Sequence, residues 1–150
     1  MNRVNVGTRD MEEPEWLPGA EAYALEVLSR LEKNDWILSV LFCGDEFIRE
    51  LNREYRAKDE PTDVLSFAMG DRVEDEGESA WLAGDIVISL PALGRNAVDF
   101  SVDADTELKR LLIHGILHLS GMDHESNDPS EPMLAEQENL LSCMRWGRIL

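Results

Sequence analysis

The segment from Asp103 to Ser120 most constrains the fold of this 150-residue chain. Its apolar residues surround a predicted helix on nearly every side instead of forming one stripe: Leu111, Leu112, Ile113, Ile116, Leu117 and Leu119. Acidic residues at its beginning suit the N-terminal end of a helix dipole, and Gly121 follows its end. A helix that is apolar all round is a buried one, so we expect this segment to lie in the core.

All three histidines of the chain lie in the segment HGILHLSGMDH, from His114 to His124. Four-residue spacing places His114 and His118 on one face of the helix, about one turn apart. A left-handed turn at Gly121 would bring the chain back, so that His124 returns as a third ligand. Two imidazoles in a buried helix need partners, and a shared metal ion satisfies both. The spacing therefore predicts a metal site made by all three histidines.

Imidazole nitrogens suit zinc, copper, iron or nickel better than magnesium or calcium. We predict one ion per chain, Zn²⁺ or another transition metal. A structural metal is the main alternative, but closed structural zinc sites usually have four protein ligands and commonly include cysteine. Three histidines leave a coordination position for water, as in catalytic sites, and the pattern predicts a metal-dependent hydrolase.

Periodicity predicts the element order β-α-β-α-β-β-α-α-α. The expected strands are Val4–Val6, Trp36–Cys43, Asp63–Ala68 and Gly84–Ser89. The expected helices are Ala20–Leu31, one capped by Asp45 with Tyr55 on its inner stripe, Leu90–Val98, Asp103–Ser120 and Pro132–Trp146. We interpret the acidic stretch Gly70–Ala80 as a surface loop. This order predicts an α+β fold in which residues 1–150 form a single domain, with a small mixed sheet and packed helices.

Fourteen basic and 31 acidic residues give a net charge of −17, which argues against broad, non-specific binding to nucleic acid. Eighteen consecutive apolar residues occur nowhere, so no membrane span is predicted. The N-terminus lacks the pattern of a secretory signal. Cys43 and Cys143 do not suggest a disulfide framework, and we predict a cytoplasmic location.

The histidine spacing is similar to the metzincin protease signature HExxHxxGxxH, with Gly121 at its glycine. One position departs from that signature, because Gly115 stands where those proteases carry a glutamate as general base. The metal ligands are kept without the peptidase base, which argues against peptide hydrolysis.

Three blocks resemble the YbeY family of bacterial endoribonucleases and ribosome-maturation factors: LNREYRAKDEPTDVLSF (Leu51–Phe67), GDIVIS (Gly84–Ser89) and HGILHLSGMDHE (His114–Glu125). The first and third blocks are highly specific. Two positions depart from the family pattern: Ala57 replaces an expected glycine, and Ala68 stands where proline is common.

The resemblance implies a zincin-like fold, a cytoplasmic location and a single-strand-specific metallo-endoribonuclease. That enzyme would act in maturation of the 3′ end of 16S ribosomal RNA and in ribosome quality control. The implied partners are single-stranded RNA, the small ribosomal subunit and its assembly factors. The family's metal ligands fall on His114, His118 and His124, and its functional arginine falls on Arg56.

Three residues are candidates for the catalytic set. Arg56 could bind a phosphate through its planar fork of donors, unless it forms an ion pair with Asp59 or Asp63. His114 is included as a metal ligand, and Asp123 could orient an imidazole or handle protons, although a turn cap is an equal alternative. Water or an RNA 2′-hydroxyl could be the nucleophile. Two other functions stay open: a different metallohydrolase (a phosphatase or peptidase) and a non-catalytic ribosome-assembly factor with a structural metal.

Overall fold

The computed structural model describes residues 1–150 apart from the side chain of Asp75. Its elements follow the predicted order. The strands are β1 (Arg3–Thr8), β2 (Trp36–Cys43), β3 (Val64–Asp75) and β4 (Glu78–Ser89). The helices are α1 (Leu17–Arg30), α2 (Asp45–Arg56), α3 (Leu90–Asp99), α4 (Ala104–Leu119) and α5 (Pro132–Cys143).

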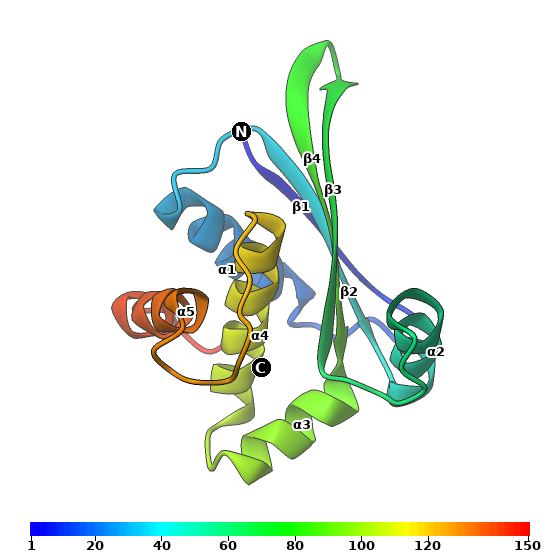
Figure 1. Ribbon diagram of the computed structural model, residues 1–150. Coiled ribbons are helices and arrows are strands. Elements are labelled where there is room, and N and C mark those ends of the chain that lie inside the picture. The colour runs from blue at the N-terminus through cyan, green and yellow to red at the C-terminus, as the bar shows by residue number, and fades with distance from the viewer.

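The strands form a mixed sheet in the order β1-β2-β4-β3. Strands β1, β2 and β4 are parallel, whereas β3 runs antiparallel to β4 at one edge. Helices α1, α4 and α5 lie on one side of the sheet and α2 lies on the other, with α3 at the lower end (Figure 1). These layers confirm the predicted α+β fold. Among the helices described, none has the length and apolarity that crossing a bilayer requires.

Helix α4 is buried as predicted, because its apolar side chains enter the main core from several sides. Leu108, Leu112, Ile113 and Ile116 have no exposed surface, and they join a core that includes Leu38, Phe42, Ile86 and Ile88 from the sheet. Asp103 caps the helix by accepting the backbone N–H of Asp105 at 2.9 Å. The most buried helix therefore carries the first two histidines.

The predicted acidic loop over Gly70–Ala80 is wrong, because β3 and β4 continue through it as a long hairpin. Glu76 and Gly77 form the turn, with φ angles of 51° and 82°, as a two-residue hairpin turn with two positive φ values requires. The described acidic side chains of this region are exposed, as expected of a solvated surface. Strand prediction depends on alternating apolar residues, and the part of the hairpin that extends beyond the core does not need them.

Several predicted boundaries also shift. Helix α1 begins at Leu17 because Pro18 occupies its first turn, where a missing N–H costs nothing. Gly44, not Asp45, is the N-cap of α2, and Asp45 instead accepts hydrogen bonds from Arg95 at 2.8 and 2.9 Å. Tyr55 is 58% exposed instead of lying on an inner stripe. Helix α5 ends at Cys143, three residues before Trp146.

Gly115 lies where α4 approaches the sheet closely. A Cβ atom on residue 115 would lie 2.8 Å from both Cδ1 and Cγ2 of Ile86 on β4. Ile86 has no exposed surface, so its side chain has little room to move aside. A side chain at position 115 would push the helix away from the strand.

Gly115→Ala should therefore destabilise the protein by about 1–3 kcal/mol, the usual cost of overpacking a core. Urea denaturation measures this change. Gly94→Ala is the matched control, because Gly94 lies in α3 and a Cβ atom added there would have no neighbour within 4 Å; helix propensity should then stabilise the protein by up to about 1 kcal/mol. Equal free energies of unfolding for the Gly115→Ala variant and the wild type would refute the close contact.

Candidate metal centre

The C-terminal half of α4 presents His114 and His118 on the same face, as their spacing predicts. Their Nε2 atoms lie 3.1 Å apart, and one ligand nitrogen of each of the three histidines lies within 4.8 Å of the others. Tetrahedral ligands at Zn–N distances of 2.0–2.1 Å are separated by about 3.3 Å. The three histidines are therefore positioned to bind a metal ion.

The turn after α4 brings the third histidine back to the first two. Gly121 has a φ of 100°. Its N–H donates to the carbonyl of His118 at 3.0 Å, and the N–H of Met122 donates to the carbonyl of Leu117 at 3.1 Å. These two bonds define a Schellman cap, which reverses the chain and leads it to His124. The predicted role of Gly121 is confirmed.

Each imidazole also has a contact outside the cluster. The Nδ1 atom of His114 lies 2.6 Å from Oε1 of Gln137, and Nδ1 of His124 lies 2.9 Å from the carbonyl of Ser126. The Nδ1 atom of His118 lies 4.0 Å from the carboxylate of Asp123. Hydrogen bonds at Nδ1 of His114 and His124 leave Nε2 available, and such partners orient ligand rings in metal sites.

Burial lowers the pKa values of His114 and His118 below that of a free histidine. For His118, the neighbouring His114 lowers the pKa further, because two adjacent imidazolium charges repel each other. Both shifts favour neutral rings near pH 7. A neutral imidazole is the form that can donate a nitrogen lone pair to a metal ion.

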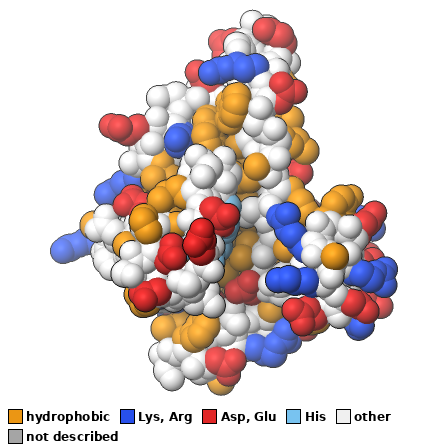
Figure 2. Space-filling model, in the orientation of Figure 1, with side chains coloured by type: hydrophobic (Ala, Val, Ile, Leu, Met, Phe, Trp, Pro, Cys, Tyr) orange, Lys and Arg blue, Asp and Glu red, His pale blue; other side chains and the backbone are white. Residues whose placement is uncertain are grey.

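The centre opens into a cleft of about 730 Å³ between α4 with its following turn and the edge strand β3. His114, His118 and Asp123 line one wall, and residues 64–68 of β3 line the other together with Arg56. In Figure 2 the histidine surface is visible at the bottom of a hollow, with acidic side chains on one side and basic side chains on the side toward α2. An extended ligand could therefore reach the histidines from solvent.

Arg56, the last residue of α2, reaches the cleft. Its Nη2 atom donates to the carbonyl of Ser66 at 2.8 Å, and its guanidinium lies over the ring of Phe67, 5.4 Å from the centroid. The two aspartates that could have paired with Arg56 have other partners. Asp59 pairs with Arg49 at 2.9 Å, and Asp63 accepts a hydrogen bond from Asn96 at 2.8 Å. Part of the guanidinium fork thus remains available to a ligand.

Ala57, which replaces the glycine expected from the YbeY pattern, follows Arg56 directly in the chain. It has a left-handed conformation, with a φ of 58°, at the C-terminal end of α2. Glycine adopts this conformation without steric cost, whereas alanine does so with strain. The substitution keeps the chain reversal that follows Arg56, so the arginine still lines the cleft.

Asp123 lies at the mouth of the cleft, with its side chain 87% exposed. Its Oδ1 atom accepts the backbone N–H of His124 at 2.8 Å, as a turn cap would. The same oxygen is the one 4.0 Å from His118. Both sequence interpretations of Asp123 are thus compatible with its position.

The candidate site residues named from the sequence include neither Gln137 nor Glu107. Gln137 is 6% exposed and contacts His114, although they are 23 positions apart. Glu107 is 1% exposed, and burial raises its pKa. Glu107 lies seven residues before His114 and therefore on the same helical face, which was the available signal for it, whereas nothing in the sequence pattern pointed to Gln137.

The geometry defines a mixed α+β protein with three histidines positioned to bind a metal ion, two of which line an open cleft. Comparison with known proteins identifies the family of this chain. The family model described as Endoribonuclease YbeY matches residues 8–145.

Curated relatives agree with that match. An Endoribonuclease YbeY from Treponema denticola is 56% identical over 122 residues, covering 81% of this chain and 79% of the relative. A protein of the same name from Treponema pallidum strain Nichols is 46% identical, covering 95% and 89% of the two chains. The solution structure of TM1509 from Thermotoga maritima is similar with a TM-score of 0.62 at 30% identity, covering 95% of this chain and 87% of that one. The chain belongs to the YbeY endoribonuclease family.

Proposed function

We propose that this protein is a single-strand-specific, metal-dependent endoribonuclease, with residues 1–150 acting as one hydrolase domain. The observation that carries the proposal is the convergence of three imidazoles, with one ligand nitrogen of each within 4.8 Å of the others, beside a cleft that His114, His118 and Arg56 line. Family membership supports RNA as the substrate, since the relatives are named endoribonucleases.

The proposed ligands are His114, His118 and His124, holding one Zn²⁺ or another transition-metal ion. An all-imidazole donor set supports this choice of metals over magnesium or calcium. When bound, such an ion supplies Lewis-acid chemistry, which polarises a phosphoryl oxygen or activates a nucleophile for attack. The protein contributes the cleft, the orientation of the rings and the charges around the phosphate.

Arg56 is the proposed phosphate ligand. One of its nitrogens is anchored on the Ser66 carbonyl, which holds the guanidinium in place at the cleft wall. The other donors can form two parallel hydrogen bonds with phosphate oxygens and stabilise charge that develops there. His114 belongs to the proposed catalytic set as a ligand. Asp123 is proposed to orient His118 and to accept a proton at the mouth of the cleft.

In the cell, we propose a cytoplasmic role in maturation of the 3′ end of 16S ribosomal RNA and in ribosome quality control. The partners would be the small ribosomal subunit and its assembly factors. The YbeY resemblance supports this role, and the charge of the chain is compatible with it. A protein of net charge −17 gains little affinity from non-specific electrostatic attraction to RNA phosphates, so a ribosomal partner would supply much of the binding free energy.

A cleavage assay on a defined RNA tests the proposal. Zinc-loaded wild type should cut a single-stranded RNA internally, a chelator should stop the reaction, and a matched duplex should resist it. His114→Ala is the control for a contaminating nuclease. If folded, zinc-loaded protein bound small ribosomal subunits but cut no RNA, the non-catalytic assembly factor would replace the proposed enzyme.

No cleavage of an unstructured protein such as casein is expected in the same conditions. The protease glutamate is absent, and the contact between position 115 and Ile86 leaves no space to accommodate one. Fluorescent casein release measures this, with a zinc protease as the positive control. Chelator-sensitive release by the wild type, lost in His114→Ala, would make the protein a peptidase.

A further inference from the structure

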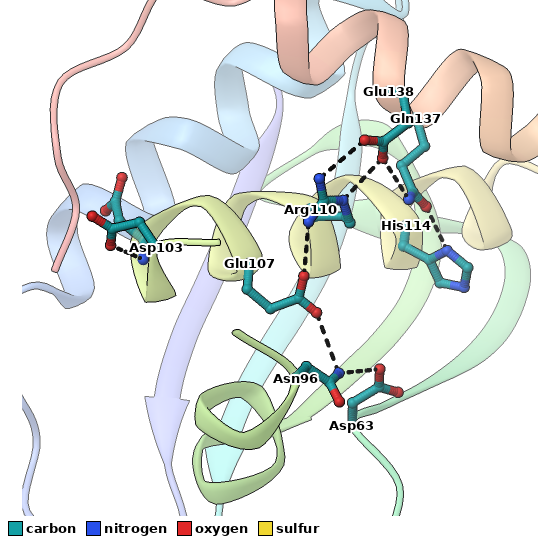
Figure 3. A network of polar contacts seen from close by, with 9 residues as sticks. Asp63, Asn96, Asp103, Glu107, Arg110, His114, Gln137 and Glu138 are labelled. Atoms are coloured by element: carbon teal, nitrogen blue, oxygen red, sulfur yellow. Dashed lines mark hydrogen bonds and ion pairs between the residues drawn. The ribbon is translucent and has the colours of Figure 1, made fainter. Parts of the chain in front are cut away.

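Polar side chains from three helices form a continuous chain of contacts that ends on His114. Figure 3 shows it extending from the beginning of β3 through α3, α4 and α5; its members are Asp63, Asn96, Glu107, Arg110, Glu138, Gln137 and His114. Only the last member belongs to the proposed ligand set. The other members therefore need a separate explanation.

Gln137 is the residue in direct contact with the ligand. Its Oε1 atom lies 2.6 Å from Nδ1 of His114, and its Nε2 donates to Oε2 of Glu138 at 3.0 Å. A carboxylate can only accept hydrogen bonds, so the amide nitrogen must face Glu138 and the amide oxygen must face His114. An amide oxygen also only accepts, so Nδ1 of His114 must carry the proton. The lone pair of the ring is then on Nε2, the atom that faces His118.

Arg110 holds the carboxylate that orients this amide. Its Nε and Nη2 atoms donate to the two oxygens of Glu138, each at 3.0 Å, which fixes the plane of the carboxylate. Its Nη1 donates to Glu107 at 3.0 Å, and Glu107 is 1% exposed. The arginine is thus bound on both sides and ties α5 to α4.

The chain of contacts continues away from the centre. Asn96 on α3 donates to Glu107 at 3.2 Å and to Asp63 at 2.8 Å. Asp63 in turn accepts the N–H of Val64 at 2.7 Å, at the first residue of β3. One end of the network is therefore fixed to the strand that forms the opposite wall of the cleft.

We propose that Gln137 is a positioning residue of the metal centre, which fixes the Nδ1-protonated form and the ring orientation of His114 through the Glu138–Arg110 pair. The proposal rests on the proposed function in so far as the ion is the one assigned there. It assigns to α5 a part in the centre, although that helix supplies none of the three histidines.

Gln137→Met tests the proposal, because methionine has a similar size but lacks the strong acceptor. Long-range ¹H–¹⁵N NMR of the metal-free protein distinguishes the two protonated forms of the His114 ring. The wild type should show proton occupancy at Nδ1, and the methionine variant should show a mixture of both forms. Competition with a chromophoric chelator should give zinc binding weakened about 10–100-fold, the usual effect of losing an outer partner of a ligand.

Two further variants separate positioning from packing. Gln137→Glu keeps an acceptor for Nδ1 but replaces the donor to Glu138 with a second carboxylate, so it should restore the NMR pattern and only part of the zinc affinity. Asn139→Met makes the same amide-to-thioether change at an exposed position of α5 and should leave both unchanged. Glu138→Gln removes the charge that orients the Gln137 amide. Because the Glu138 side chain is half-exposed, this variant can replace Gln137→Met if the methionine protein fails to fold.

A folded Gln137→Met protein with the wild-type ring form and wild-type zinc affinity would overturn the proposal. This result is distinguishable from failure of the proposed function, because neither measurement involves RNA. Altered ring form and weaker zinc binding in a protein whose wild type cuts no RNA would reject the nuclease and keep Gln137 as a positioning residue.

Discussion

His118→Ala should abolish tight metal binding and lower RNA cleavage by more than about a hundredfold, because losing even an outer partner of a ligand costs 10–100-fold. The variant retains only one of the two helical ligands and loses the nitrogen that lies 3.1 Å from Nε2 of His114. Metal content per chain after dialysis, measured by elemental analysis, should fall from about one to near zero.

The fold should survive this change. The His118 side chain is 27% exposed at the cleft wall, so alanine leaves no closed cavity in the core. Circular dichroism and thermal melting of metal-free wild type and variant should agree within a few degrees. The same metal content in His118→Ala, His114→Ala and wild type would show that the histidines do not form the centre.

Arg56→Ala should lower RNA cleavage by about a hundredfold, comparable to the loss of one charge-stabilising donor in an active site. Metal content should not change, because Arg56 is not a proposed ligand. If the residue makes one phosphate contact, the salt dependence of single-strand binding should also decrease by about 0.7 in slope. Single-turnover cleavage and a salt titration measure the two effects.

Two arginine variants control this experiment. Arg53→Ala removes an exposed cation from the same helix, at a position outside the residues lining the cleft. It should keep near wild-type activity. Arg56→Lys keeps the charge but not the planar fork, so it should recover only part of the rate. Equal cleavage by wild type and Arg56→Ala, or an Arg56→Ala protein that melts with much lower stability, would remove the residue from the catalytic set.

The features predicted best from the sequence are those that depend on nearby residues. The three histidines and Gly121 lie within one short segment, so helical spacing and a left-handed cap predicted their grouping. The order of strands and helices followed from local periodicity in the same way. Buried strand β2 was predicted with its observed bounds, since its apolar run is bounded by Gly44.

The features missed depend on contacts between distant segments. The β3–β4 hairpin extends away from the core, so its acidic, solvated strands resemble a loop in composition. Gln137 meets His114 only because α5 packs against α4, and the periodicity of either helix contains no information about that pairing. The anchor of Arg56 is a backbone carbonyl, which every residue type provides. Arg56 became a candidate through the resemblance to YbeY and not through a local pattern.

The three histidines lie on two different kinds of backbone, a buried helix and a turn, and this difference affects which metal ions the site could bind. His114 and His118 are fixed by a buried helix, whereas His124 follows a glycine turn in a segment stabilised by short-range contacts such as the one with Ser126. Ions of different radius require slightly different ligand spacings. A bound ion would therefore be held by two ligands on a fixed helix and by a third ligand on a turn that could adjust to its radius. The occupant of the site should therefore follow the metal supply of the cell more closely than it would in a rigid cage.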